Sequence, residues 1–287
     1  MRVYLALATN ILRQSISHYL AAVALTTAAL AGSAHAARFV DEPFDYISGS
    51  LAGQTGGVGF SGPWTQTEGA EGAAQVAEGS LQHPALGASG NRCLLAFDEF
   101  EVQSKIQRGL TPLQPMDGSV YWVSYLLKEE IGASPNNASQ FLLVLNSTDT
   151  PERRVVFGVS SQAKRFRIGG GTSIETQTNT VAAAATGQTY LLVASISFNL
   201  NGVETARLFI DPALDSEPTS PSAIVTNFEL SSIDSVEMLA GDESPLWGFD
   251  ELRIGDSYFA VVPEPSVSLS FLLGAPLLLG VRRRRVW

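Results

Sequence analysis

Residues 37–262 predict an all-β fold, a sandwich of two antiparallel sheets. Short apolar or alternating runs recur along this stretch between clusters of turn-forming residues, as they do in sandwiches. No apolar stripe repeats every 3.6 residues, which an amphipathic helix would require. The pair Asn201-Gly202 stands between two β-rich runs, and the positive φ that it tolerates predicts a tight hairpin.

Ten runs in this body have the pattern of strands. They cover residues 92–97, 120–128, 140–146, 153–160, 163–168, 190–198, 205–210, 223–228, 235–239 and 248–254. The one Ala-rich stretch, 182–185, is short and is followed by Gly187, so we expect a loop or a single turn there. Helices are expected only in the two terminal segments. A body of 225 residues, 38–262, is large enough for one core.

Several motifs of the body resemble exported concanavalin A-like or laminin-G-like domains. They are Phe44-Asp45-Tyr46 with the later Gly62-Pro63-Trp64, the run 120–126, the strand end 208–212 and the closing run 248–255. The resemblance covers most of the body and implies a jelly roll of two curved antiparallel sheets. It also implies that the final strand, near 249–254, returns to pair near the start. Lectins, glucanases and adhesion modules share this fold, so the motifs leave the activity open.

The first 36 residues have the composition of a secretory signal peptide. Arg2 and Arg13 precede an apolar stretch at 19–30, and Ala34 and Ala36 supply the small-x-small cleavage pattern. We expect signal peptidase to cut after Ala36, which leaves the body outside the cytoplasmic membrane. A retained N-terminal anchor is the alternative.

The last 25 residues combine three features. Pro263-Glu264-Pro265 is followed by an apolar run, 267–281, and by Arg282-Arg283-Arg284-Arg285. As a helix of about 1.5 Å per residue, the run is about 22 Å long, short of a ~30 Å hydrocarbon core. This length favours a temporary transmembrane segment.

The same three features, in this order, resemble the PEP-CTERM sorting signal of Gram-negative bacteria that make extracellular polysaccharide. The resemblance implies that a membrane protease, the exosortase, recognises Pro263, Glu264 and Pro265 and cuts near them, while the arginines hold the tail in the cytoplasm. It places the protein in the cell envelope, on the outer surface or in the extracellular matrix, after transient anchoring in the inner membrane. An ordinary tail anchor that is never cut is the alternative.

The charge of the body argues against nucleic acid as a partner. The whole chain has a net charge of −10. With Arg2, Arg13, Glu264 and the four tail arginines set aside, 12 basic and 27 acidic residues remain, a net of −15. Such a body repels phosphate backbones.

Calcium is compatible with this acidity and with loop oxygen donors such as Asp211, Asp215 and Asp242. No spacing identifies a site, so we assign neither a metal nor a cofactor.

Few residues of the body could support catalysis. Glu99 and Glu101 would share one face of a strand, but Gln103 and Phe97 stand where related glucanases place a third acid. Asp250 and Glu251 are adjacent and should point to opposite faces. His83 is the one histidine after the signal peptide, and Cys93, the only cysteine, sits in an apolar run and should be a buried thiol. We therefore assign no catalytic residue.

Carbohydrate binding requires fewer specific residues than catalysis does. Sugar rings stack on exposed aromatic side chains, and Trp64 and Trp247 lie beside Gly and Pro in loops, whereas Trp122 should be core. The sequence therefore predicts an exported adhesion or carbohydrate-binding protein without catalysis, with Trp64 and Trp247 as candidate glycan contacts and extracellular polysaccharide as partner. A glycoside hydrolase of the concanavalin A-like class and a passive structural coat protein are the alternatives.

Overall fold

A computed structural model describes residues 36–262 except 85, 87–89, 97–102, 132–138, 148–152, 162, 172–175, 200–201 and 242–245. The expected signal helix, the membrane segment and the sorting residues Pro263, Glu264, Pro265 and Arg282 to Arg285 lie outside this range, as does Ala34. Within the described part of the chain, no helix is both long enough and apolar enough to cross a membrane.

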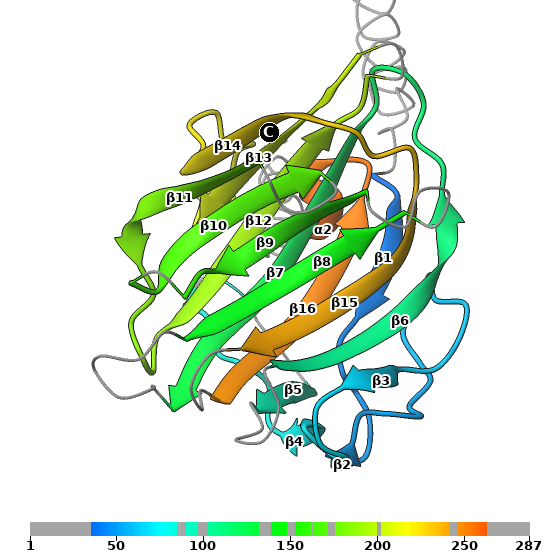
Figure 1. The fold of residues 1–287 in the computed structure, drawn as a ribbon, viewed down its shortest axis with the longest axis vertical. Helices are drawn as coiled ribbons and strands as arrows, with labels where there is room; N and C mark the ends of the chain where they lie inside the picture. Colours follow the sequence, from blue (N-terminus) through cyan, green and yellow to red (C-terminus); the bar gives the residue numbers. More distant parts are fainter. Residues whose placement is uncertain are drawn as a thin grey trace, which may run out of the picture. The chain divides into compact units, whose positions relative to one another are not determined.

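Two antiparallel sheets form the body, as the sequence predicts (Figure 1). The nine-stranded sheet contains β1 (Arg38–Glu42), β2 (Gly49–Ser50), β4 (Ala74–Glu78), β5 (Asn91–Ala96), β7 (Val120–Ile131), β12 (Thr189–Ser197), β13 (Glu204–Ile210), β14 (Ala223–Phe228) and β16 (Leu246–Gly255). The seven-stranded sheet contains β3 (Thr65–Glu68), β6 (Gln103–Leu113), β8 (Gln140–Asn146), β9 (Arg154–Val159), β10 (Arg165–Gly171), β11 (Thr176–Ala183) and β15 (Ile233–Gly241). The architecture is a jelly-roll sandwich.

The strand order places distant segments side by side. The nine-stranded sheet runs β14-β13-β12-β7-β16-β5-β4-β2, and the seven-stranded sheet runs β11-β10-β9-β8-β15-β6-β3. β1 also pairs with β16, Val40 opposite Ile254, so the final strand does return to the start of the body. β5 pairs with the first half of β16 and β1 with its second half.

The predicted hairpin is confirmed by its strands. β12 and β13 pair from Ser197 opposite Thr205 to Leu192 opposite Ile210. Each of the ten predicted strands has a counterpart, and those at 140–146 and 223–228 match at both ends.

Six strands were not predicted: β1 to β4, β6 and β11. β11 also corrects the loop expected over 182–185, because it continues to Ala183. β11 is an edge strand of its sheet and has few buried side chains; Val181, for example, is 95% exposed. Because few of its positions must be apolar, its sequence lacks the pattern that marks a strand.

The core fills the space between the sheets. Alternate residues of β8 and β9, such as Phe141, Leu143 and Phe157, point inward. The rings of Phe141 and Phe249 stack at 5.5 Å, which joins the two sheets. Cys93 is fully buried in this core, as predicted.

A single-turn helix, α2 (Tyr258–Val261), corrects the expectation that helices are confined to the terminal segments. It packs on the face of the nine-stranded sheet turned away from the core, which we call the back face and which presents Trp122, Leu126, Leu191, Val193 and Phe209. Tyr258 meets Trp122 edge to face at 5.4 Å, and Ser124 Oγ donates to the carbonyl of Val261 at 2.7 Å. Tertiary packing holds this turn, because four residues are too few for a stable helix alone.

Candidate functional site

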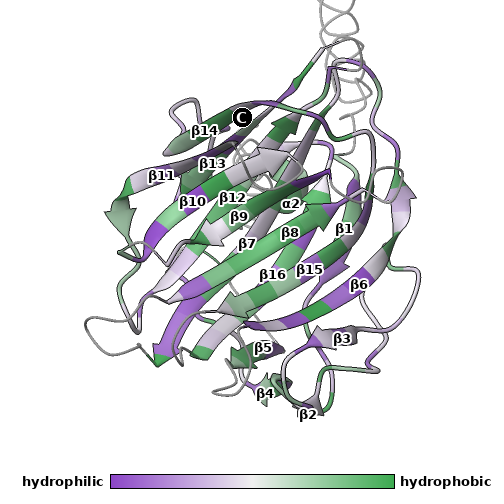
Figure 2. Cartoon of the chain, viewed as in Figure 1, coloured by the Kyte–Doolittle hydropathy of each residue, from purple (hydrophilic) through white to green (hydrophobic). Residues whose placement is uncertain are grey.

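The candidate site is the face of the seven-stranded sheet that is turned away from the core. Because successive residues of a strand point to opposite faces, the residues next to the inward Phe141, Phe157 and Phe166 point to this side. We call it the outer face, and its side chains are Lys105, Gln107, Gln140, Leu142, Val144, Asn146, Arg154, Val156, Arg165, Arg167, Gln177, Asn179, Glu237 and Leu239. Figure 2 shows the hydrophilic and hydrophobic residues that alternate at the start of β10, where Arg165 and Arg167 flank Phe166.

The strand register arranges these residues in rows across the sheet. One row runs Asn179, Arg167, Gly158, Leu142, Leu239 and Lys105. The next runs Gln177, Gly169, Val156, Val144, Glu237 and Gln107.

The middle of both rows is apolar. Leu142, Val144 and Val156 form a cluster of their own, at most 2% exposed, with Leu239 packed against it. Half-buried or exposed amide and charged side chains stand at both ends of the rows, around this apolar floor.

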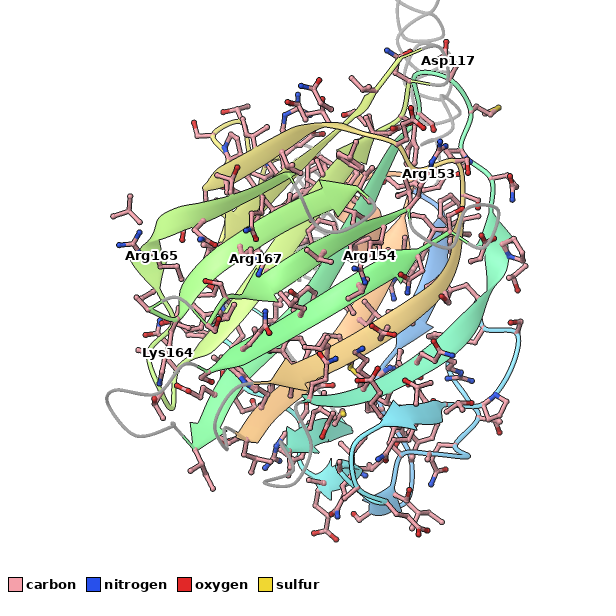
Figure 3. All side chains as sticks on the ribbon, in the orientation of Figure 1. Asp117, Arg153, Arg154, Lys164, Arg165 and Arg167 are labelled. Carbon is pink, nitrogen blue, oxygen red and sulfur yellow. The ribbon has the colours of Figure 1, made fainter. Side chains whose placement is uncertain are left out.

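Three arginines of the outer face lack ion-pair partners among the described residues. Arg154 comes from β9, and Arg165 and Arg167 come from β10. The Nε atoms of Arg154 and Arg167 are buried and have no hydrogen-bond partner there either. Burial lowers the pKa of Arg167 from its usual value. Figure 3 shows the three arginines spread across β9 and β10.

Their neighbours Arg153 and Lys164 are different. Arg153 pairs with Glu229, and Lys164 Nζ lies 2.8 Å from Oε1 of the buried Glu129. An unpaired guanidinium is a ready donor for a carboxylate or a sulfate, because it offers two parallel N–H groups. The outer face therefore combines donors for anions with amides that suit hydroxyl groups.

Two carboxylates belong to this side of the described sheet. Burial raises the pKa of Glu237, and the charges of Lys105 and Arg154 oppose this rise, although neither forms an ion pair with it. Glu68, at the β3 edge, accepts a hydrogen bond from Lys105 Nζ at 2.6 Å, and this contact lowers its pKa. Glu99 and Glu101, the acids considered from the sequence, lie outside the described residues.

The two tryptophans proposed as glycan contacts are core residues, which corrects that assignment. Trp64 and Trp247 are each 1% exposed. Trp64 packs on Phe44 with ring centroids 6.0 Å apart, and Trp247 packs on Phe141 at 5.9 Å. Neither indole offers a face to a sugar. Trp122 is 5% exposed and belongs to the back face, so its predicted burial is confirmed.

Trp64 belongs to a buried polar network that the sequence did not reveal. Its Nε1 donates to Glu42 Oε2 at 3.2 Å, and Arg108 Nη1 donates to the same oxygen at 2.7 Å. Arg108 also donates to the carbonyls of Gly62 and Gly56, at 2.7 and 2.9 Å. Every charge in this network is satisfied, so its role is structural.

The remaining acids considered from the sequence are dispersed. Asp211 Oδ1 accepts from the backbone N–H of Leu191 at 2.7 Å and lies 3.2 Å from His83 Nε2. Asp215 is exposed, and Asp242 lies outside the described residues. Among the residues that the structure describes, no three His, Cys, Asp or Glu side chains are grouped as a metal site would require.

Asp250 and Glu251 lie where β16 changes partner from β5 to β1. Asp250 is buried and accepts from Ser80 Oγ and, at 2.9 Å, from the backbone N–H of Leu81. Burial raises its pKa to about 7. Glu251 has a positive φ of 55° at a bulge and pairs with Arg253. Both carboxylates thus stabilise the point at which β16 changes its partner strand.

A cavity of about 350 Å³ lies beside the β12–β13 turn. Its walls include Arg153, Asn199, Glu204 and Glu229. The positive charge of Arg153 in this wall is neutralised by its ion pair with Glu229. Glu204 accepts a hydrogen bond from the backbone N–H of Leu230 at 3.2 Å. We therefore favour the outer face as the site.

No protein-family model and no curated protein sequence matches the chain. The chain is similar to several solved structures. Domain 4 of AbnA, an extracellular arabinanase from Geobacillus stearothermophilus, solved with arabinotriose, is 19% identical over 79% of this chain and 97% of its own, with a TM-score of 0.47. An endo-1,3-β-glucanase from Streptomyces sioyaensis is 11% identical over 78% and 98%, with a TM-score of 0.48. Carbohydrate-binding module CBM66 from Bacillus subtilis is 10% identical over 67% and 94%, with a TM-score of 0.39.

Proposed function

We propose that the protein binds a polysaccharide on the outer face without cleaving it. The observation that supports this function is the arrangement of that face, where amide and guanidinium side chains in register surround an apolar floor. Sugars present hydroxyls to such amides, while the apolar residues beneath, at most 2% exposed, support the polar side chains and do not themselves contact a ligand. Binding of this kind would give the protein an adhesive role on an extracellular matrix.

Asn179 provides the test. Its Oδ1 is buried without a hydrogen-bond partner among the described residues, and it stands beside Arg167 at the end of the first row. We expect Asn179→Ala to weaken binding of the intact protein to its glycan on an array of bacterial polysaccharides. Thr205→Ala, on the back side of β13, is the control and should bind like the wild type. Failure of the wild type to bind any polysaccharide would refute the proposal.

A second candidate is glycoside hydrolysis, which one observation favours. Glu237 and Glu68 lie on the same side of the sheet, and their environments move their pKa values in opposite directions, as for an acid and its partner. Lys105 engages Glu68, which argues for a structural ion pair. Release of reducing ends from a bound polysaccharide, abolished in Glu237→Gln and Glu68→Gln, would establish hydrolysis. Binding without release would leave the first function.

We also propose that the body is exported and processed at both ends. The support is the sequence of residues 1–36 and 263–287, with the cleavage pattern at Ala34 and Ala36 and the Pro263-Glu264-Pro265 triplet. Val262 is fully buried on the back face, so a cut after it would leave the described core whole.

Intact-mass analysis of protein from a Gram-negative host with an exosortase tests this route. We expect the wild type to lack residues 1–36 and the arginines 282–285. Pro263→Ala and Glu264→Ala should keep those arginines. Recovery of the full-length wild-type chain would contradict processing.

A further inference from the structure

We infer that the polysaccharide is acidic and lies along β9 and β10, with its carboxylate or sulfate groups bound by Arg154, Arg165 and Arg167. This inference rests on the proposed function, since it names the ligand class of the same face. Its starting point is the unusual state of these arginines in a chain with a net charge of −10. Arg38, Arg92, Arg108, Arg153 and Arg253 all pair with acids, yet these three pair with none among the described residues. Arg207, on the opposite sheet, also makes no ion pair there, but it donates a hydrogen bond to Ser197 Oγ.

The buried Nε atoms sharpen the argument. A buried donor without an acceptor costs free energy, and most such donors in proteins are satisfied. The Nε atoms of Arg154 and Arg167 are in this condition. Those of Arg92 and Arg253 also lack a hydrogen bond, but they lie 3.1 Å from Glu130 and 3.4 Å from Asp41, whereas Arg154 and Arg167 have no carboxylate at such a distance among the described residues. Burial also lowers the pKa of Arg167, so an approaching anion would stabilise its charged form. Both side chains therefore gain from an external acceptor.

The spacing of the arginines points to a polymer. Arg154 is opposite Gly171, four residues from Arg167 along β10. At about 3.3 Å per residue, this offset is about 13 Å, and Arg165 lies about 7 Å beyond Arg167 in the other direction. One small anion cannot contact all three guanidinium groups, whereas a chain with repeated acidic groups can.

The path between the arginines crosses two glycines. Gly169 and Gly158, which lie opposite Val156 and Arg167, project no side chain from the outer face. Asn179 and Gln177 border the path on β11. An acidic polysaccharide thus meets guanidinium groups at its acids and amides at its hydroxyls.

Nucleic acid fits this face less well. Single strands are held by bases stacked on aromatic side chains, and the outward residues of the described strands are Arg, Gln, Asn, Leu and Val instead. The negative charge of the rest of the protein also opposes a densely charged backbone.

Matched pairs of polymers test the inference. The intact protein is titrated with polygalacturonate and its methyl ester, alginate and its propylene glycol ester, dextran sulfate and dextran, and with poly(dT). We expect at least one acidic polymer to bind, and its uncharged partner to bind at least about tenfold more weakly. Arg154→Gln and Arg167→Gln should each weaken the acidic ligand about tenfold, and added salt should weaken it in the wild type.

Arg207→Gln is the control variant. It removes the same charge from β13, on the opposite sheet, where Arg207 Nη1 donates to Ser197 Oγ at 3.2 Å. It should bind like the wild type, and circular dichroism should show that all three variants remain folded.

The outcomes separate the two proposals. Equal binding of an acidic polymer and its ester, unchanged in the arginine variants, would overturn the acidic ligand and leave polysaccharide binding intact. Tighter binding of poly(dT) than of any acidic polysaccharide would overturn the ligand class. Failure of every polysaccharide, charged or neutral, would overturn both proposals.

Discussion

Arg108 and Glu42 form a buried ion pair between the two sheets. Nη1 of Arg108 lies 2.7 Å from Oε2 of Glu42, and the side chains are 3% and 0% exposed. The guanidinium also lies 4.0 Å from the centre of the Phe60 ring. Removing one member of such a pair leaves a buried charge without compensation, which is strongly destabilising.

Arg108→Met should therefore lower the free energy of unfolding by about 3–5 kcal/mol. Arg153→Met is the matched control, because the Arg153–Glu229 pair is exposed, and it should cost less than about 1 kcal/mol. Urea denaturation of both variants gives the comparison. Equal losses would show that burial does not determine the strength of the Arg108 pair.

Asp250 should make stability fall as pH rises from about 4 to about 7. Its carboxyl has an ordinary pKa of 3.8, and burial raises this to about 7 in the folded protein. Between these values the folded state binds the proton and the unfolded state does not, so folding is favoured at the acidic end and loses this contribution above pH 7.

Asp250→Asn removes this titration while retaining an acceptor for Ser80 and Leu81. The variant should gain stability relative to the wild type between about pH 4 and 7. The unfolding free energies of the wild type and the variant, measured across this pH range, test the prediction. Parallel pH curves for the two proteins would exclude Asp250 as the titrating group.

Gly158 sits where a side chain has no room. Its φ is 154°, and a Cβ there would lie 2.0 Å from the carbonyl oxygen of Phe141. Gly158→Ala should cost about 1–3 kcal/mol, because the adjacent strand must move. Gly62→Ala should stay within about 0.5 kcal/mol, since a Cβ at Gly62 meets nothing within 4 Å. Thermal unfolding of the two alanine variants tests this, and similar midpoints would contradict it.

Tyr258 and Phe259 are adjacent aromatic residues in α2 with different burial. Tyr258 is fully buried and donates to the carbonyl of Ala213 at 2.5 Å, whereas Phe259 is 40% exposed. Tyr258→Ala should cost about 3–5 kcal/mol through the cavity it leaves against Trp122. Phe259→Ala should cost under about 1 kcal/mol. Denaturant titrations that rank Phe259→Ala as the more damaging change would refute the docking of α2.

Central strands could be recognised from sequence because their signal is local. β8, Gln140–Asn146, is a run of buried apolar residues and was predicted at both ends. The hairpin of β12 and β13 depends on a turn between neighbouring runs. Edge strands such as β11 carry no such pattern, because few of their side chains enter the core.

The candidate site was only half present in the sequence. The run Arg165-Phe166-Arg167-Ile168 already places both arginines on one face of a strand, a signal that could have been found. The stacking of the two sheets decides which face of the strand is turned inward. It also decides that no acid among the described residues forms an ion pair with those arginines.

The sequence by itself determined the all-β class, the antiparallel hairpin and the burial of Cys93, because each follows from side chains close together along the chain. Tertiary structure alone decided that Trp64 is core, that Arg108 meets Glu42 across 66 positions, and that Arg154 joins Arg167 on one surface. Alternation along a strand defines two faces, but the partner sheet decides which of them is withdrawn from water.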